Sequence, residues 1–137
     1  MSLAAPLQGP VSMNLPFAPT SAGDVRRALV SWLENLGSPR PVIDDATLVV
    51  TELVANAIRH ADPLSNDTVL VRWQQVGSEL VLSVTDGGGG GATPRRVDAA
   101  PEAESGRGLA IVEALSLDWQ IEHPHGLTLV SVRLPLQ

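Results

Sequence analysis

The chain has 137 residues, of which 44% are hydrophobic and 18% charged, a length and composition typical of one globular domain. Its formal net charge is −6 and it contains no cysteine, which argues against direct nucleic-acid binding and excludes disulfides and thiolate metal sites. No signal peptide or membrane-spanning apolar run is visible, so we expect a cytoplasmic protein with no membrane partner.

The N-terminal end of the chain divides into a tail and a first strand. Residues 1–10 show no hydrophobic period and contain two prolines and a glycine, so we predict a flexible tail followed by one domain over residues 11–137. Apolar residues then alternate with polar or small ones over residues 11–17, which predicts a strand with one buried face. Pro16 suits the edge of a sheet, because proline cannot donate to a strand ladder.

Two helices are predicted after this strand. Apolar residues at helical spacing over 25–36 indicate a helix that starts near Thr20-Ser21 and ends at Gly37. From Asp44 to Ala61 the apolar residues follow the i, i+3, i+4, i+7 pattern of a helix packed on a core.

The rest of the chain alternates between strands, a glycine-rich stretch and a short helix. Segments rich in β-branched residues predict two hairpins, residues 68–76 with 79–85 and residues 118–123 with 127–134. The glycine-rich stretch of residues 87–105 is too long for an ordinary connection and indicates a lid or disorder. Residues 109–115 are predicted to form a short core helix. This order predicts an α+β sandwich with a mostly antiparallel sheet.

Glu52, Asn56 and His60 form one polar stripe on the second predicted helix, with Arg59 beside them. A solvated helix face is the simpler interpretation of the stripe taken alone. The functional alternative is a metal–phosphate site, in which the Asn56 amide oxygen serves Mg²⁺ and Glu52 accepts a proton.

Asp86 ends an apolar strand and is followed at once by five glycines. Asp-Gly is a common turn signal, so a simple flexible turn is one interpretation. Alternatively, a carboxylate fixed at a strand end can accept a hydrogen bond from the exocyclic amine of adenine, and glycines let the backbone approach a flat base. Farther on, Gly106-Arg107-Gly108 opens the short helix, whose N-terminus could face a phosphate.

Two other residue types in the sequence receive structural interpretations. His123 and His125 alternate around Pro124 with no third ligand nearby, so no zinc site is expected there. The three tryptophans lie in segments of apolar periodicity and are expected in the core.

Three segments together carry a family resemblance. ELVANAIRHA (52–61), TDGGGG (85–90) and SGRGLAIV (105–112) resemble the N, G1 and G2 boxes of the GHKL (Bergerat-fold) ATPase superfamily, most of all in its anti-sigma-factor serine kinases and related single-domain actinobacterial regulators. The resemblance extends from about Val11 to Leu136. It implies a two-layer α/β sandwich whose mixed, mostly antiparallel sheet is covered on one face by helices.

The resemblance also implies roles for single residues. Asn56 would hold Mg²⁺ through the ATP phosphates, Glu52 would be the catalytic base and Asp86 would bind the adenine amine. Gly88, Gly90, Gly106 and Gly108 match box glycines, and Thr128 matches a threonine that helps to hold adenine through water. The remaining residues expected to contact the nucleotide are Arg59, His60, Arg107 and Leu109.

The function that the resemblance implies is that of an ATP-binding anti-sigma factor acting as a serine-protein kinase on an anti-sigma antagonist. Its partners would be a sigma factor and the antagonist, with a homodimer possible and no direct contact with nucleic acid. One alternative is a non-catalytic module in which ATP orders the lid and creates a partner surface. A less favoured one is a fragment of a sensor histidine kinase, because no dimerisation helix with a phospho-accepting histidine is visible.

Overall fold

The computed structural model describes residues 8–89 and 104–137. Five strands form one sheet in the order β1-β2-β3-β5-β4, and all four pairings between neighbouring strands are antiparallel. The elements in chain order are β1 (Val11–Pro16), α1 (Ser21–Leu36), α2 (Arg40–His60), β2 (Thr68–Val76), β3 (Glu79–Asp86), α3 (Glu104–Leu115), β4 (Asp118–Glu122), a 3₁₀ turn (Pro124–Gly126) and β5 (Thr128–Pro135). The expected α+β class is therefore confirmed.

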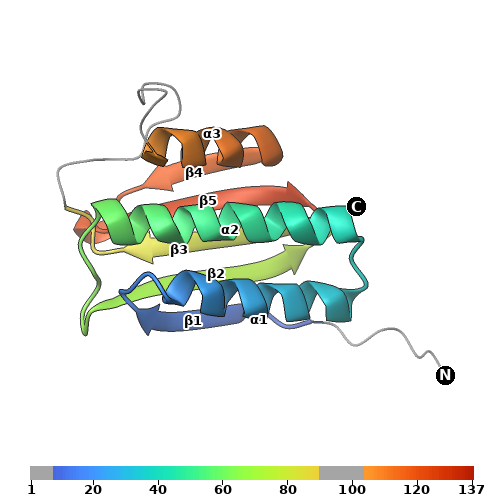
Figure 1. The fold of residues 1–137 in the computed structure, drawn as a ribbon, viewed down its shortest axis with the longest axis horizontal. Coiled ribbons are helices and arrows are strands. Elements are labelled where there is room, and N and C mark those ends of the chain that lie inside the picture. The colour runs from blue at the N-terminus through green and yellow to red at the C-terminus, as the bar shows by residue number, and fades with distance from the viewer. Residues whose placement is uncertain (1–7, 90–103) are drawn as a thin grey trace.

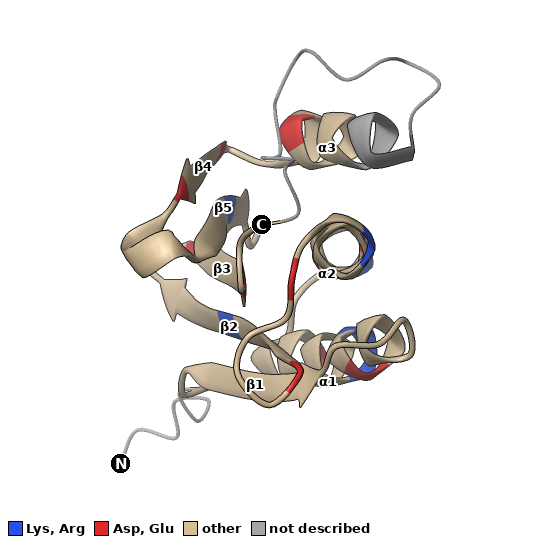
Figure 2. Ribbon diagram, turned by 90° about the vertical axis from the view of Figure 1, so that its left-hand side faces the viewer, with Lys and Arg blue, Asp and Glu red and all other residues tan. Residues whose placement is uncertain are grey.

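The three helices cover one face of the sheet, as Figure 2 shows from the side. In Figure 1, α1 lies over β1, α2 crosses the middle of the sheet and α3 lies over β4. Alternate strand residues point toward the helices because successive side chains of a strand face opposite sides. The buried side chains that line this face of the central strands are Val69, Val71, Trp73, Leu80, Leu82, Val84, Val130, Val132 and Leu134. One hydrophobic core thus fills the space between the two layers.

Most of the predicted segments are confirmed, and the edge position expected for the first strand is confirmed by the strand order. The helix predicted from Asp44 begins at Arg40 instead, with Pro41 in its first turn. Proline suits that position because its missing N–H has no partner inside the helix anyway. The predicted tail residues 1–7 lie outside the described residues, whereas Gly9 accepts a hydrogen bond from Trp32 Nε1 at 3.2 Å.

The helix predicted to open at Gly106 begins two residues earlier, at Glu104. Gly106 and Gly108 are therefore inside α3 rather than in a turn before it. A glycine in a helix interior costs about 1 kcal/mol relative to alanine. Packing of the buried Leu109 and Val112 on the core offsets that cost. Of the predicted lid, residues 90–103 lie outside the described part of the chain.

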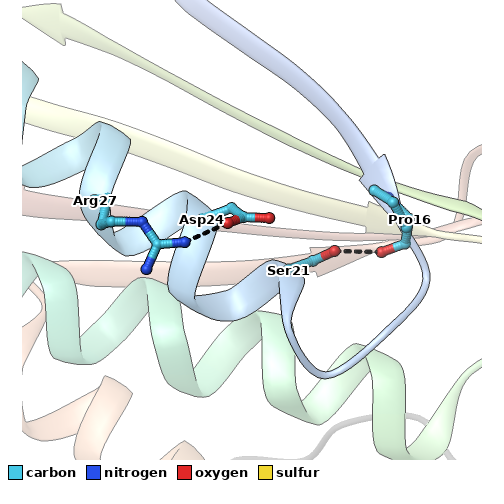
Figure 3. Close-up of polar contacts among 4 residues, drawn as sticks. All are labelled: Pro16, Ser21, Asp24 and Arg27. Atoms are coloured by element: carbon cyan, nitrogen blue, oxygen red, sulfur yellow. Dashed lines mark hydrogen bonds and ion pairs between the residues drawn. The ribbon is translucent and has the colours of Figure 1, made fainter.

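The start of α1 is held by Ser21 rather than by its neighbour Thr20. Thr20 occupies the cap position but its side chain makes no cap hydrogen bond. The buried Ser21 hydroxyl instead donates to the Pro16 carbonyl oxygen at 2.6 Å, and Arg27 pairs with Asp24 on the exposed side of the same helix (Figure 3). This bond ties the helix layer to the end of the edge strand.

Candidate functional site

Two polar side chains interrupt the apolar face of the sheet at one end. Along β3 and β5 the helix-facing residues are apolar until the last position of β3 and the first of β5, which are Asp86 and Thr128. The two residues are direct cross-strand partners in the β3–β5 register. Asp86 is only 5% exposed and Thr128 only 7%. The structure therefore brings together a carboxylate and a hydroxyl that lie 42 positions apart in the sequence.

The glycine loop, residues Gly87–Gly89, lies against the end of α2. Gly87 donates its N–H to the Asp62 carbonyl oxygen at 2.7 Å, and the Asp62 N–H donates to the Gly88 carbonyl oxygen at 2.9 Å. A Cβ atom at Gly87 would lie 2.1 Å from the Pro63 carbonyl oxygen, so the backbones approach too closely for any side chain. These bonds set the last turn of α2 beside Asp86.

The histidine turn, residues His123–Gly126, closes the other side of the glycine loop. Gly88 has a φ of +72°, and a Cβ atom added to it would lie 2.2 Å from the Gly126 carbonyl oxygen. Glycine is thus required at position 88 both by the backbone angle and by the contact. The glycine loop is therefore confined between the end of α2 and the β4–β5 connection.

Asp86 is a buried carboxylate whose ionised form is only partly compensated. Its Oδ1 accepts a hydrogen bond from the Gly88 N–H at 2.7 Å. Burial raises the pKa of Asp86 and the nearby Asp62 carboxylate raises it further, whereas the Gly88 N–H and His123 act in the opposite direction. Among the described residues, Gly88 is the one hydrogen-bond donor to this carboxylate. The site can therefore accept a further donor, such as an amine.

The polar stripe of Glu52, Asn56 and His60 is half-buried rather than freely solvated. Successive members lie about 6 Å apart along the axis of α2, since a helix rises about 1.5 Å per residue. His60 Nε2 is buried and has no hydrogen-bond partner among residues 8–89 and 104–137, whereas Arg59 is exposed on the last turn. The stripe leads along α2 to the end of the helix against which the glycine loop is bonded.

The donor set on α2 fits a metal ion held mainly by a nucleotide. No group of three or more His, Cys, Asp or Glu side chains suited to a metal occurs among residues 8–89 and 104–137. Mg²⁺ commonly uses only one or two protein oxygens together with phosphates and waters, and Asn56 with Glu52 one turn away can supply such oxygens.

The segment that resembles the G2 box lies in α3, the helix next to α2. α3 packs against α2, as Figure 1 shows, and the Leu109 side chain of α3 is buried in the core. The side chains of residues 104–108, among them Arg107, and all of Gly90 lie outside what the structure describes. The three boxes are thus brought to one region of the molecule through α2, the glycine loop and α3.

Sequence reasoning missed three residues that surround Asp86. They are Asp62, whose backbone bonds the glycine loop, Gly126, whose carbonyl contacts Gly88, and His123, whose ring nitrogen lies 3.4 Å from the Thr128 hydroxyl. Asp62 and Gly126 carried only turn signals. The alternation of His123 and His125 was visible, but nothing local indicated that the turn returns to the glycine loop.

The contact at Gly88 predicts an unusually costly alanine substitution. Gly88→Ala should lower the free energy of unfolding by at least about 2 kcal/mol more than Gly77→Ala. Gly77 is the matched control, because its φ of +60° imposes a similar backbone strain but nothing lies within 4 Å of its Cβ position. Urea unfolding followed by tryptophan fluorescence measures both values, and equal losses would contradict the close contact.

Burial of Asp86 predicts that its replacement stabilises the fold. Asn can keep the bond from the Gly88 N–H without a buried charge, so Asp86→Asn should raise the free energy of unfolding at pH 7. Because the pKa is raised in the folded protein, the gain should shrink as pH falls and vanish below the ordinary pKa of 3.8. Unfolding curves measured from pH 3 to 8 test this, and a gain that does not change with pH would refute it.

Comparisons with known proteins identify the fold and the family. A search of curated proteins found no match. The chain is 25% identical to the structure of the RsbU and RsbW domains of Rv1364c from Mycobacterium tuberculosis, with a TM-score of 0.72 over 93% of this chain and 32% of the other. It therefore spans about a third of that protein. None of the described helices is long and apolar enough to cross a membrane.

Two further solved structures share the fold at lower identity. The SiaB-SiaC complex from Pseudomonas aeruginosa matches with 15% identity and a TM-score of 0.61, over 90% of this chain and 88% of the other. The Acinetobacter baumannii histidine kinase AdeS matches with 14% identity and a TM-score of 0.52, over 93% and 68%. Residues 15–134 match the family model described as a histidine kinase-like ATPase domain. Because this match spans most of the chain, the protein belongs to the family of histidine kinase-like ATPase domains.

Proposed function

We propose that this domain binds ATP with Mg²⁺ and acts as an anti-sigma factor that phosphorylates a serine of an antagonist protein. The observation that carries the ATP site is the buried Asp86–Thr128 pair at the end of an otherwise apolar sheet face. A buried carboxylate costs stability unless it is paired. A ligand whose amine donates a hydrogen bond to Asp86 would offset this cost.

Adenine is the base that this pair suits. Its exocyclic amine donates to a carboxylate, whereas guanine has a carbonyl at the same ring position and would place one acceptor against another. The glycine loop leaves no side chain between its backbone and a flat ring. Asp86 would therefore select adenine, with the Thr128 hydroxyl beside it completing the polar edge.

The phosphates would extend from this site toward α2 and α3. Asn56 would offer its amide oxygen to Mg²⁺, and Arg59, His60 and the segment Gly106–Leu109 would contact the phosphates, as would Gly90 in the lid. The ion would supply charge neutralisation for the phosphates when bound. An overall negative chain needs such local groups to hold an anion, since its formal net charge is −6.

Glu52 is the residue that would make the domain a kinase rather than a binder. It lies one turn before Asn56 on the same stripe of α2 and is half-buried. Its carboxylate would take the proton of the acceptor serine while the serine oxygen bonds to the γ-phosphorus. The bond from that phosphorus to the β–γ bridging oxygen breaks, and ADP leaves with the electron pair.

The regulatory role is supported by the 25% identity to a chain that contains an RsbW domain together with an RsbU domain. We propose a sigma factor and an antagonist as the partners, with a homodimer as the assembly. The second candidate function is a non-catalytic module that presents a partner surface when ATP is bound. It shares the Asp86 site with the kinase and differs in having no use for Glu52 as a base.

Nucleotide titrations test the ATP site. Wild-type protein should bind ATP and ADP more tightly than GTP, and Asp86→Asn should weaken ATP binding by at least about tenfold, as expected for losing a hydrogen bond to a charged group. The same substitution is expected to stabilise the fold, so unfolding cannot explain the loss. Asn56→Ala should lose mainly the Mg²⁺-dependent part of the affinity. Equal affinity for GTP, or an Asp86→Asn variant that binds like wild type, would overturn the assignment.

Phosphoryl transfer separates the two candidate functions. Incubation with ATP, Mg²⁺ and antagonist proteins encoded in the same genome should yield a phosphoserine on one of them. Glu52→Gln should retain ATP binding within about threefold but lose at least about 100-fold in transfer rate, the usual contribution of a general base. Binding of ATP without any phosphoprotein would favour the non-catalytic module.

A further inference from the structure

We propose that His123 is a positioning residue of the adenine site, where it orients the Thr128 hydroxyl beside Asp86. The inference rests on the proposed ATP site and adds a residue to it. Neither the G1 segment nor the N segment contains His123. It was predicted as the last residue of a strand over 118–123, whereas in the structure β4 ends at Glu122 and His123 begins the β4–β5 connection.

The geometry joins the two side chains directly. His123 Nδ1 lies 3.4 Å from Thr128 Oγ1, a distance at the long end of the hydrogen-bonding range. Thr128 is buried, and among the described residues the His123 ring is the one hydrogen-bond partner of its hydroxyl. A buried hydroxyl without a partner costs free energy, so the ring both satisfies the hydroxyl and fixes its direction.

The backbone around His123 holds it at this distance. The Leu127 N–H donates to the Pro124 carbonyl oxygen at 2.9 Å and closes the histidine turn. The Gly126 carbonyl in turn packs against Gly88, next to Asp86. His123 is close enough to Asp86 for its charge to lower the pKa of that carboxyl. The ring is therefore placed by the same contact that shapes the glycine loop.

The chemical consequence concerns what Thr128 offers to a bound base. A hydroxyl has one proton and two lone pairs, and a histidine Nδ1 can either donate to it or accept from it. With the ring in place, the Thr128 hydroxyl is oriented toward Nδ1, and the tautomer of His123 decides whether the hydroxyl proton or a lone pair is left for the adenine edge or for a bridging water. Without the ring, the hydroxyl can rotate, and part of the binding free energy is spent on ordering it.

His125 provides a matched comparison two residues away. It lies in the same turn and is exposed, as His123 is, but its side chain makes no hydrogen bond or ion pair with the described residues. Its φ of +52° is one that asparagine tolerates well, so His125→Asn should leave the turn intact. For His123, Asn is also the conservative replacement, because its amide group can occupy the place of Nδ1.

The test is a set of ATP and ADP titrations with stability measured on each variant. His123→Ala should weaken the binding of both nucleotides by about 3- to 10-fold, the range expected for one lost neutral hydrogen bond. His123→Asn should recover most of the lost affinity, and His125→Asn should leave the affinity for both nucleotides unchanged. Thr128→Val should weaken binding as well, and adding His123→Ala to it should cause little further loss, since both act through one contact.

The outcomes distinguish this inference from the ATP site itself. If wild type binds ATP but His123→Ala binds equally well, the role of His123 is overturned while the site stands. A loss larger for ATP than for ADP would also overturn it, because that result would assign His123 to the phosphates. If the double variant lost as much affinity as the two single losses multiplied together, the role of His123 would be overturned as well. If wild type binds no adenine nucleotide, both proposals fail.

Discussion

The arrangement of the site depends on one backbone contact, the pair of hydrogen bonds between Asp62 and the glycine loop. It can form only because Gly87 and Gly88 lack side chains where the chain passes Pro63 and Gly126. The contact fixes the end of the longest helix against the end of a central strand. The polar stripe of α2, Asp86 and the histidine turn therefore share one region, although they come from three separate parts of the sequence.

Asp86 is a buried carboxylate that costs the fold stability, and in the proposed site this cost is the counterpart of recognition. Its carboxylate lies where the rest of the sheet face is apolar, and burial makes its ionised form unfavourable. Replacing it with a neutral isostere removes that cost, yet it also removes the acceptor that would distinguish adenine from guanine. Burying the Thr128 hydroxyl beside it costs less free energy, because a hydroxyl is neutral and needs only one hydrogen-bond partner when buried.

The histidine turn contacts both the glycine loop and the Asp86–Thr128 pair proposed to bind the base. His123 meets Thr128, Gly126 meets Gly88, and both contacts lie next to Asp86. In an ATP-binding domain of this shape, the connection between the last two strands thus becomes one wall of the site. Variation in this turn among related chains would change base affinity without touching the three glycine-rich or helical segments that mark the family.

The sequence by itself determined the elements and the family. Periods of two and 3.6 residues placed five strands and three helices, since those patterns arise from local geometry and burial on one face. It also indicated Glu52 and Asn56 through their helical spacing, and Asp86 through its place at a strand end before five glycines. Only the tertiary structure decided that Asp86 faces Thr128 in register and that Asp62, Gly126 and His123 surround it. Such contacts depend on how segments that are far apart in the sequence pack together, and no local pattern of residues encodes that packing.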